Sequence, residues 1–177
     1  MTSELLIDRA ALSATDPRLD TWREFIHTHA RLLRVMDEEL QVTHGLSLAE
    51  YDALLQLAGV PGRRLRMSAL ADRVLLSRSG ITRLVDRLVA AGMVERSACI
   101  SDARGAEATL TTLGLERLRD ASRTHLAGVE RYFLGAMDES DRVALQRTLG
   151  RISSGLDAGP ADGSPARNTD CAIDGPA

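Results

Sequence analysis

The chain has 177 residues, a formal net charge of −3 at pH 7, 44% hydrophobic residues and only 3% aromatic residues. A chain of this length buries about two-thirds of its unfolded surface, so folding requires neither a disulfide nor a metal staple. No apolar run approaches the ~18 residues that a transmembrane helix needs, and we expect no membrane association. These features predict one globular domain followed by a tail.

The N-terminal segment, residues 1–15, is acidic and interrupted by polar side chains. It lacks the basic start and apolar centre of a signal peptide, which predicts a cytoplasmic protein. Its weak periodicity predicts only a partly ordered arm. The two cysteines, Cys99 and Cys171, are far apart in sequence, and a structural disulfide is not expected in that compartment.

Positive charge is concentrated in one part of the chain. Residues 61–112 contain nine arginines and five acidic residues, whereas the remainder has thirteen arginines and twenty acidic residues. A local basic region suits phosphate binding, because attraction between charges in solution decays over about 8–10 Å. Every cationic side chain is a guanidinium, which can grip phosphates or guanine edges with two hydrogen bonds. Codon bias in a GC-rich genome accounts for most of the absence of lysine.

The first predicted helix runs from about 16 to 43. Asp16 is its expected N-cap, and Pro17 is suited to the first helical position. Apolar residues recur on more than one stripe of this helix, which is typical of a helix packed on both sides, as at a dimer interface. Gly45 is placed to end the helix in the left-handed conformation.

A second predicted helix covers residues 48–59. Ser47 and Glu50 form a capping-box pattern at its start. A Gly- and Pro-containing break follows the helix, and residues 64–66 are expected to form one short strand.

Two further helices are predicted at 69–75 and 78–91, capped by Ser68 and Ser77. On a helical wheel, the second of these is apolar on one side and polar on the other. The inward side consists of Ile81, Leu84, Val85, Leu88 and Val89. The outward side consists of Ser79, Thr82, Arg83, Asp86 and Arg87. An ordinary surface helix has the same pattern, but the short helix before it and the hairpin after it favour DNA recognition.

The hairpin is predicted from two strands, at 93–98 and 107–111, joined by a polar tip. Gly105 suits the turn. Arg104 can enter a minor groove, where a narrow groove concentrates negative potential. Asp102 is expected to orient Arg104 or an arginine of the preceding helix, with a simple turn role as the alternative.

Two helices are predicted after the hairpin, at 112–137 and 138–154, with Thr111 and Asp138 as caps. Both are amphipathic and have little sequence-adjacent core to cover, so we expect them to pair with a second subunit. Residues 155–177 are rich in Gly, Pro, Ala and Asp and lack periodicity, which predicts a disordered tail.

The predicted fold is therefore mainly α with a small β-hairpin wing: a winged helix-turn-helix lobe at about 48–111, with helical dimerisation regions at about 16–43 and 112–154. Such a lobe reads double-stranded DNA with the second helix of its helix-turn-helix, here the helix at 78–91. The expected DNA contacts are Ser68, Arg78, Ser79, Thr82, Arg83, Arg87 and Arg104.

The rival interpretation is a winged helix that binds protein instead of DNA. Exposed apolar anchors would be expected on such a helix, and the polar outward face favours DNA.

No enzyme signature is present in the sequence. There is no nucleotide-binding loop, no Gly-x-Ser-x-Gly, no His/Cys cluster and no pair of carboxylates with an evident cleft. We expect no catalytic activity, no cofactor and no metal site.

Three segments carry a resemblance to a known family: HGLSLAEYDALLQLA at 44–58, LADRVLLSRSGITRLVDRLVAAGMVER at 70–96 and DARGAEATLTTLG at 102–114. Together they resemble the MarR (multiple-antibiotic-resistance regulator) family over about residues 17–154. One departure is Ala108, where many relatives carry Val, and it should only reduce the core of the hairpin.

The resemblance implies a homodimer of triangular outline, held together by its terminal helices within a domain at 16–154. Its two lobes would insert recognition helices into successive major grooves of a pseudo-palindromic operator, with half-sites about 34–36 Å apart. Relatives are mostly repressors, often released by a small phenolic or acidic ligand that binds between the dimer helices and the lobe.

The signal that this chain would sense is less defined. Position and residue type suggest an effector pocket formed by Trp22, Ile26, His29, His44, Leu46 and Tyr51. For each of them a plain role in the core or interface is the alternative.

Two other signals remain open. Metal sensing would need the histidines, but His27, His29, His44 and His125 show no helical metal-site spacing. Oxidation of Cys99 in the wing is a further alternative, although no activating base or resolving cysteine is evident.

Overall fold

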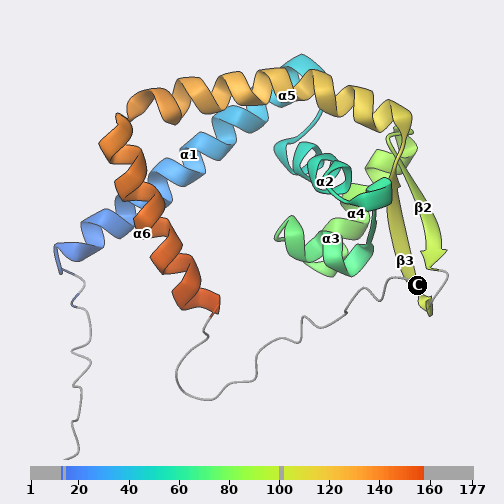
Figure 1. Ribbon diagram of the computed structural model, residues 1–177, viewed down its shortest axis with the longest axis horizontal. Coiled ribbons are helices and arrows are strands. Elements are labelled where there is room, and N and C mark those ends of the chain that lie inside the picture. Colours follow the sequence, from blue (N-terminus) through green and yellow to red (C-terminus); the bar gives the residue numbers. More distant parts are fainter. Residues whose placement is uncertain (1–12, 14, 100–101, 158–177) are drawn as a thin grey trace, which may run out of the picture. The chain divides into compact units, whose positions relative to one another are not determined.

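The computed structural model describes residues 13, 15–99 and 102–157, without the side chains of Cys99 and residues 102–104. The described chain is mostly helical with one small antiparallel sheet (Figure 1), which confirms the predicted fold class. It divides into two compact units at Val129/Glu130. None of the helices in the described ranges is long and apolar enough to cross a membrane.

The elements follow in chain order, including two short 3-10 turns, η1 and η2. They are α1 (Arg18–His44), α2 (Leu48–Ala58), η1 (Pro61–Arg63), β1 (Arg64–Arg66), α3 (Met67–Arg73), α4 (Arg78–Ala90), β2 (Val94–Cys99), β3 (Asp102–Leu110), α5 (Thr112–Tyr132), η2 (Leu134–Ala136) and α6 (Glu139–Asp157). Within the first unit, α2, α3 and α4 gather beside the β2–β3 hairpin (Figure 1), and these elements with β1 and η1 are called the winged lobe below.

The sheet of the winged lobe has the strand order β1-β3-β2, and both pairings are antiparallel. Leu65 of β1 lies opposite Ala108 of β3, and Ala108 is completely buried. The pairing of β2 with β3 is irregular between Ala98 and Cys99. Both strands extend further toward the tip than predicted, and Gly105 lies within β3 instead of in a turn.

One buried cluster joins the helices of the winged lobe to the hairpin and to α5. Its larger members are Leu40, Leu46, Tyr51, Leu54, Leu57, Leu70, Ile81, Leu84, Val85, Leu88, Met93, Val94, Leu110 and Leu118. The inward face predicted for α4 is confirmed for four of its five residues. The exception is Val89, which is 39% exposed. It lies near the end of the helix, where less of the lobe packs against it.

Most of the predicted helix starts are confirmed by their capping bonds. The Ser47 hydroxyl accepts from the Glu50 N–H at 3.2 Å, and the Ser77 hydroxyl accepts from the Gly80 N–H at 3.1 Å. The Thr111 hydroxyl likewise accepts from the backbone of α5. Each cap satisfies a backbone donor that the first helical turn leaves unpaired.

Other helix boundaries differ from the predictions. The prediction that Ser68 caps the third helix is wrong, because α3 begins at Met67 and places Ser68 inside its first turn. Helix α1 begins at Arg18, although the Asp16 carboxylate does accept from the Arg18 N–H at 2.9 Å. Helix α5 ends at Tyr132, and α6 continues to Asp157, beyond the predicted limit.

Glycine permits a very close approach where α5 meets the hairpin. A Cβ atom at Gly114 would lie 2.1 Å from the Met93 carbonyl oxygen and 2.7 Å from Leu110 Cδ1. This contact sets how closely the first turn of α5 packs against the end of the wing, and only glycine fits there.

Candidate nucleic-acid interface

The polar face of α4 lies at the surface of the winged lobe, as predicted. Arg78, Ser79, Arg83 and Arg87 are exposed, and Thr82 is half-buried. The burial of the opposite face, through residues such as Ile81 and Val85, fixes this orientation. The first turn of α4 thus presents small hydroxyl and glycine residues to solvent, with longer cationic side chains further along the helix.

A hollow of about 380 Å³ lies between the start of α3, the first turns of α4 and the wing. Its lining contains three arginines, each from a different element: Arg66 precedes α3, Arg78 begins α4, and Arg96 lies on β2. Ser68 and Thr82 also line it. The partial positive charge of a helix N-terminus adds to that of the guanidinium groups, so this hollow favours an anion.

Sequence reasoning placed Arg78, Ser68 and Thr82 among the DNA contacts, and the fold brings these three together at the hollow. It did not identify Arg66 or Arg96 individually, although both belong to the basic region of residues 61–112. Their convergence depends on the pairing of the strands and the packing of α3, which no local pattern encodes. The side chains of Arg104 and Asp102 lie outside the described residues.

Two ion pairs connect α4 to its neighbours. Arg87 Nε donates to Glu50 Oε1 of α2 at 2.7 Å, and Arg96 Nη1 of β2 lies 3.2 Å from Asp86 Oδ1. The Glu50 side chain is only 12% exposed, whereas Asp86 and Arg96 are 57% and 40% exposed. The first pair is better shielded from water and salt, so it should be the stronger of the two.

The pKa of Glu50 reflects this environment. Burial acts to raise the pKa of the carboxyl, but hydrogen bonds from the Ser47 backbone and from Arg87 outweigh burial and hold the pKa below its ordinary value. Glu50 is therefore a carboxylate with both oxygens engaged by donors.

A second cavity, of about 610 Å³, lies over α2 within the first unit. Its lining is mostly apolar and comes from α1, α2, α5 and the residue that follows α3. The lining residues are Leu33, Arg34, Met36, Asp37, Leu48, Ala49, Tyr51, Asp52, Leu55, Val74 and His125.

Two of these side chains, Tyr51 and His125, pack together with ring centroids 4.4 Å apart. The Nδ1 atom of His125 is buried and has no hydrogen-bond partner in the described part of the chain. Burial lowers the pKa of His125, and the charge of Asp52 acts in the opposite direction. On this side of the cavity, burial thus favours the neutral form of the imidazole.

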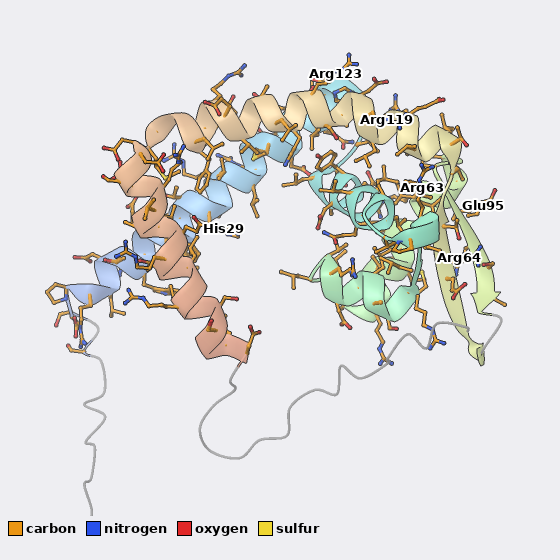
Figure 2. The ribbon with its side chains drawn as sticks, in the orientation of Figure 1. His29, Arg63, Arg64, Glu95, Arg119 and Arg123 are labelled. Atoms are coloured by element: carbon orange, nitrogen blue, oxygen red, sulfur yellow. The ribbon has the colours of Figure 1, made fainter. Side chains whose placement is uncertain are left out.

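Of the six residues expected at an effector pocket, Tyr51 lines this cavity. Leu46 is fully buried in the core, and His44 Nε2 lies 2.8 Å from the Thr124 hydroxyl of α5. The remaining three, Trp22, Ile26 and His29, are exposed on α1. Figure 2 shows His29 on α1, apart from the winged lobe.

The alternatives based on metal and redox chemistry concern the histidines and Cys99. Among the described residues, no group of three His, Cys, Asp or Glu side chains is arranged to hold a metal ion. The Cys99 side chain is not part of the described set.

Comparison with known proteins agrees with this fold. A family model described as MarR family matches residues 44–105. AbsC, a MarR family transcriptional regulator from Streptomyces coelicolor, is 32% identical, with 84% of this chain and 98% of AbsC covered and a TM-score of 0.74.

Sco3205, a MarR family transcriptional regulator from the same organism solved in complex with DNA, is 31% identical. The match covers 88% of this chain and 96% of Sco3205, with a TM-score of 0.77. Comparison with curated proteins gave no significant match. The two solved structures are matched over nearly their whole lengths, and the chain belongs to the MarR family of transcriptional regulators.

Proposed function

We propose that this protein is a sequence-specific double-stranded DNA-binding repressor that acts as a homodimer on a pseudo-palindromic operator and is released by a small molecule. The observation that carries the proposal is the hollow lined by Arg66, Arg78 and Arg96 beside the exposed polar face of α4. Three guanidinium groups from three elements, in a chain of net charge −3, form a site suited to a nucleic-acid backbone.

The proposed contacts divide into two groups, one on the exposed side of α4 and one in the hollow. Ser79, Thr82 and Arg83 lie on the exposed side of its first half, and we assign them to base edges in the major groove. Arg66, Arg78 and Arg96 in the hollow are assigned to phosphates, which position the helix without reading sequence. Arg104 is retained as a minor-groove contact of the wing, oriented by Asp102.

The homodimer is supported by apolar side chains that the described chain leaves exposed. On α1 these are Trp22 at 59%, Phe25 at 49% and Ile26 at 41%, and on α6 the most exposed are Ile152 at 56% and Leu156 at 77%. Aromatic and aliphatic side chains repeated along helices in this way are typical of a face that another chain covers.

The 610 Å³ cavity over α2 is the proposed effector site. Its volume falls in the range of small-molecule pockets, about 300–1,000 Å³, and its mostly apolar lining with a few polar groups is typical of them. A phenolic ligand suits the buried, unpartnered Nδ1 of His125, because a hydroxyl can donate to or accept from an imidazole. An acidic group would have to approach Arg34, since Asp37 and Asp52 repel it elsewhere in the lining.

Selection of bound sequences from a randomised duplex library, with the purified full chain, tests the proposal directly. Enrichment of an inverted repeat with half-site centres about 10–10.5 base pairs apart is expected. The variant Arg83→Ala should then bind the enriched duplex about 1–3 kcal/mol more weakly and lose preference at one base pair per half-site.

A folded wild-type protein that enriches no sequence and shows no salt-dependent affinity for DNA would reject the proposal. Capture of a protein partner through the same face would favour the rival interpretation. For the effector site, a thermal-shift screen of phenols and aromatic acids should give hits in the wild type that are lost in Leu55→Trp, which fills the cavity.

A further inference from the structure

Arg87 is the cation of α4 that the protein itself holds most firmly. Its Nε donates to Glu50 Oε1 at 2.7 Å, and its Nη1 lies 3.4 Å from the Arg83 carbonyl oxygen on the preceding turn. A guanidinium group is planar and rigid, so two contacts made by different nitrogens fix its orientation. The side chain nevertheless remains 59% exposed, which leaves part of the group accessible to a ligand.

Glu50 is fixed in turn by the start of its own helix. Its second oxygen, Oε2, accepts from the Ser47 N–H at 3.0 Å, while the Ser47 hydroxyl accepts from the Glu50 N–H. The capping box thus uses one carboxylate oxygen and leaves the other for Arg87. Because the Glu50 side chain is largely buried, little freedom remains for this oxygen to move.

The cap by itself does not explain why residue 50 is glutamate. Glutamine serves equally well in a capping box, but it has a single acceptor oxygen. With that oxygen on the Ser47 N–H, its NH₂ group would face the Nε–H of Arg87, and two donors would meet. The second acceptor of glutamate is therefore required by Arg87.

The position of Arg87 along α4 indicates what it meets. Arg87 lies nine residues after Arg78, about 13.5 Å further along the axis at 1.5 Å per residue. A helix that enters the major groove by its first turns has its later turns beside the sugar-phosphate backbone. A guanidinium at that point contacts a phosphate and not a base edge.

We propose that Glu50 is a positioning residue for operator binding: it holds the Arg87 guanidinium in the orientation in which its exposed part binds a DNA phosphate. This assignment rests on the proposed function. Through Glu50, helix α2 thereby supports the later turns of α4, where Arg87 lies. The Asp86–Arg96 pair, whose carboxylate belongs to the residue before Arg87, is exposed and has no comparable shielding.

Positioning and charge predict opposite effects on DNA affinity when the Glu50 carboxylate is removed. Glu50 is an acidic residue close to a DNA-binding face, and its charge alone repels phosphate. If charge were its only effect, removal of the carboxylate would strengthen DNA binding. If Glu50 positions Arg87, its removal weakens binding, because the freed guanidinium must lose rotational freedom on contact.

The test uses Glu50→Gln, Arg87→Met, the double variant and a matched control, Asp72→Asn. Asp72 is an exposed acidic residue of α3 in the same lobe, so its substitution removes the same charge without touching Arg87. Affinity is measured by fluorescence anisotropy with the duplex enriched by selection, over a series of salt concentrations. Circular dichroism and thermal unfolding confirm that each variant is folded.

We expect Glu50→Gln to bind about tenfold more weakly, a loss of about 1.4 kcal/mol. The slope of log affinity against log salt should become shallower by about 0.9, the value for one lost phosphate contact. Asp72→Asn should bind as well as the wild type or better. In the Arg87→Met background, Glu50→Gln should cause no further loss, since the residue it positions is absent.

Arg87→Lys is a second variant that leaves the capping box of α2 intact. It keeps the positive charge but lacks the planar fork, so it should reproduce the loss seen with Glu50→Gln. A gain of affinity in Glu50→Gln equal to that in Asp72→Asn, or losses that add in the double variant, would overturn the assignment while leaving the proposed function intact. Absence of DNA binding by the folded wild type would reject the proposed function and this assignment together.

Discussion

Helix α4 buries Ile81, Leu84, Val85 and Leu88 within 13 residues, whereas α6, with 19 residues, buries none. Both helices are amphipathic, but only α4 has its apolar face covered by its own chain. Along α6, Val143, Leu149 and Ile152 remain 40–56% exposed. The apolar face of α4 is thus covered within one chain, whereas α6 has an apolar stripe that a second chain is proposed to cover.

This difference has a physical origin in the neighbours of each helix. The apolar face of α4 packs on the sheet and on α2 and α3, which are joined to it by short connections. Fully burying an aliphatic side chain contributes about 1.5–3 kcal/mol. The winged lobe gains this contribution when one chain folds, whereas the described chain leaves the apolar stripe of α6 without it.

The largest expected effect comes from Gly114→Ala, which tests how tightly the winged lobe is packed. The added Cβ would lie 2.1 Å from the Met93 carbonyl oxygen, and a backbone atom cannot easily move away. We expect destabilisation of about 3 kcal/mol or more, at the upper end of overpacking effects. Urea unfolding measures it.

Gly150→Ala in α6 is the matched control for that substitution. A Cβ at Gly150 meets nothing within 4 Å, so alanine should stabilise the helix by up to about 1 kcal/mol through its higher propensity. Equal effects of the two substitutions would show that the winged lobe is no more tightly packed than α6.

Ile152→Asp tests whether a second copy covers the stripe on α6. Placing a carboxylate in an apolar interface without a partner costs several kcal/mol, so dimerisation should weaken by more than about tenfold. Sedimentation equilibrium measures the change, and a cooperative thermal transition would show that the winged lobe is still folded. An unchanged dimer would place the interface elsewhere.

His125→Phe tests the polar side of the cavity and the pH dependence of stability. Burial lowers the pKa of His125 below its ordinary value of 6.5, despite the opposing charge of Asp52. Above pH 6.5 the imidazole is neutral in both the folded and unfolded states. As the pH falls below 6.5, the unfolded state takes up its proton first, so wild-type stability declines until the lower folded-state pKa is reached.

The phenylalanine variant keeps a ring against Tyr51 and has no proton to gain. It should therefore lose less stability than the wild type between about pH 7 and pH 5, measured by urea unfolding. It also removes the unpartnered buried nitrogen, whose cost is about 1 kcal/mol or more.

Leu75→Gly has the smallest expected effect and concerns the turn between α3 and α4. Leu75 adopts a positive φ of 56° at the end of α3, where the Leu76 N–H donates to the Ala71 carbonyl at 3.0 Å. Glycine is the usual residue in this left-handed position. We expect a gain of about 0.5–1 kcal/mol from the relief of strain.

Leu75→Ala is the control, because it shortens the side chain but keeps the strain. Leu75 is 91% exposed, so alanine should leave stability nearly unchanged. A loss of stability in both variants would mean that the leucine side chain packs in the assembled protein.

Local features of this fold were predictable from the sequence because they depend on neighbouring residues. The caps at Ser47 and Ser77, the left-handed Gly45 and the buried face of α4 follow from short-range patterns. Ser68 shows the limit of such short-range patterns. The residues around it predict a helix cap at Ser68, but the helix begins one residue earlier, at Met67.

The arrangement of the candidate site was less predictable, since it depends on contacts between distant elements. Arg66 and Arg96 reach the same hollow only because α3 and the hairpin pack together. Glu50 was recognised as a capping residue, but its partner Arg87 is 37 positions away. The cavity over α2 combines residues from Leu33 to His125, and of the six side chains expected there only Tyr51 lines it.

The alternation of roles along α2 has an evolutionary consequence. Ala49 and Tyr51 line the cavity, and Glu50 between them faces the recognition helix instead. If the cavity binds the effector and Glu50 supports Arg87, as proposed, substitutions at cavity positions such as Leu48 or Leu55 would change which molecule is accepted without altering Glu50. On these two proposals, a lineage that carries this helix would be able to acquire a new chemical signal while it retains an old operator.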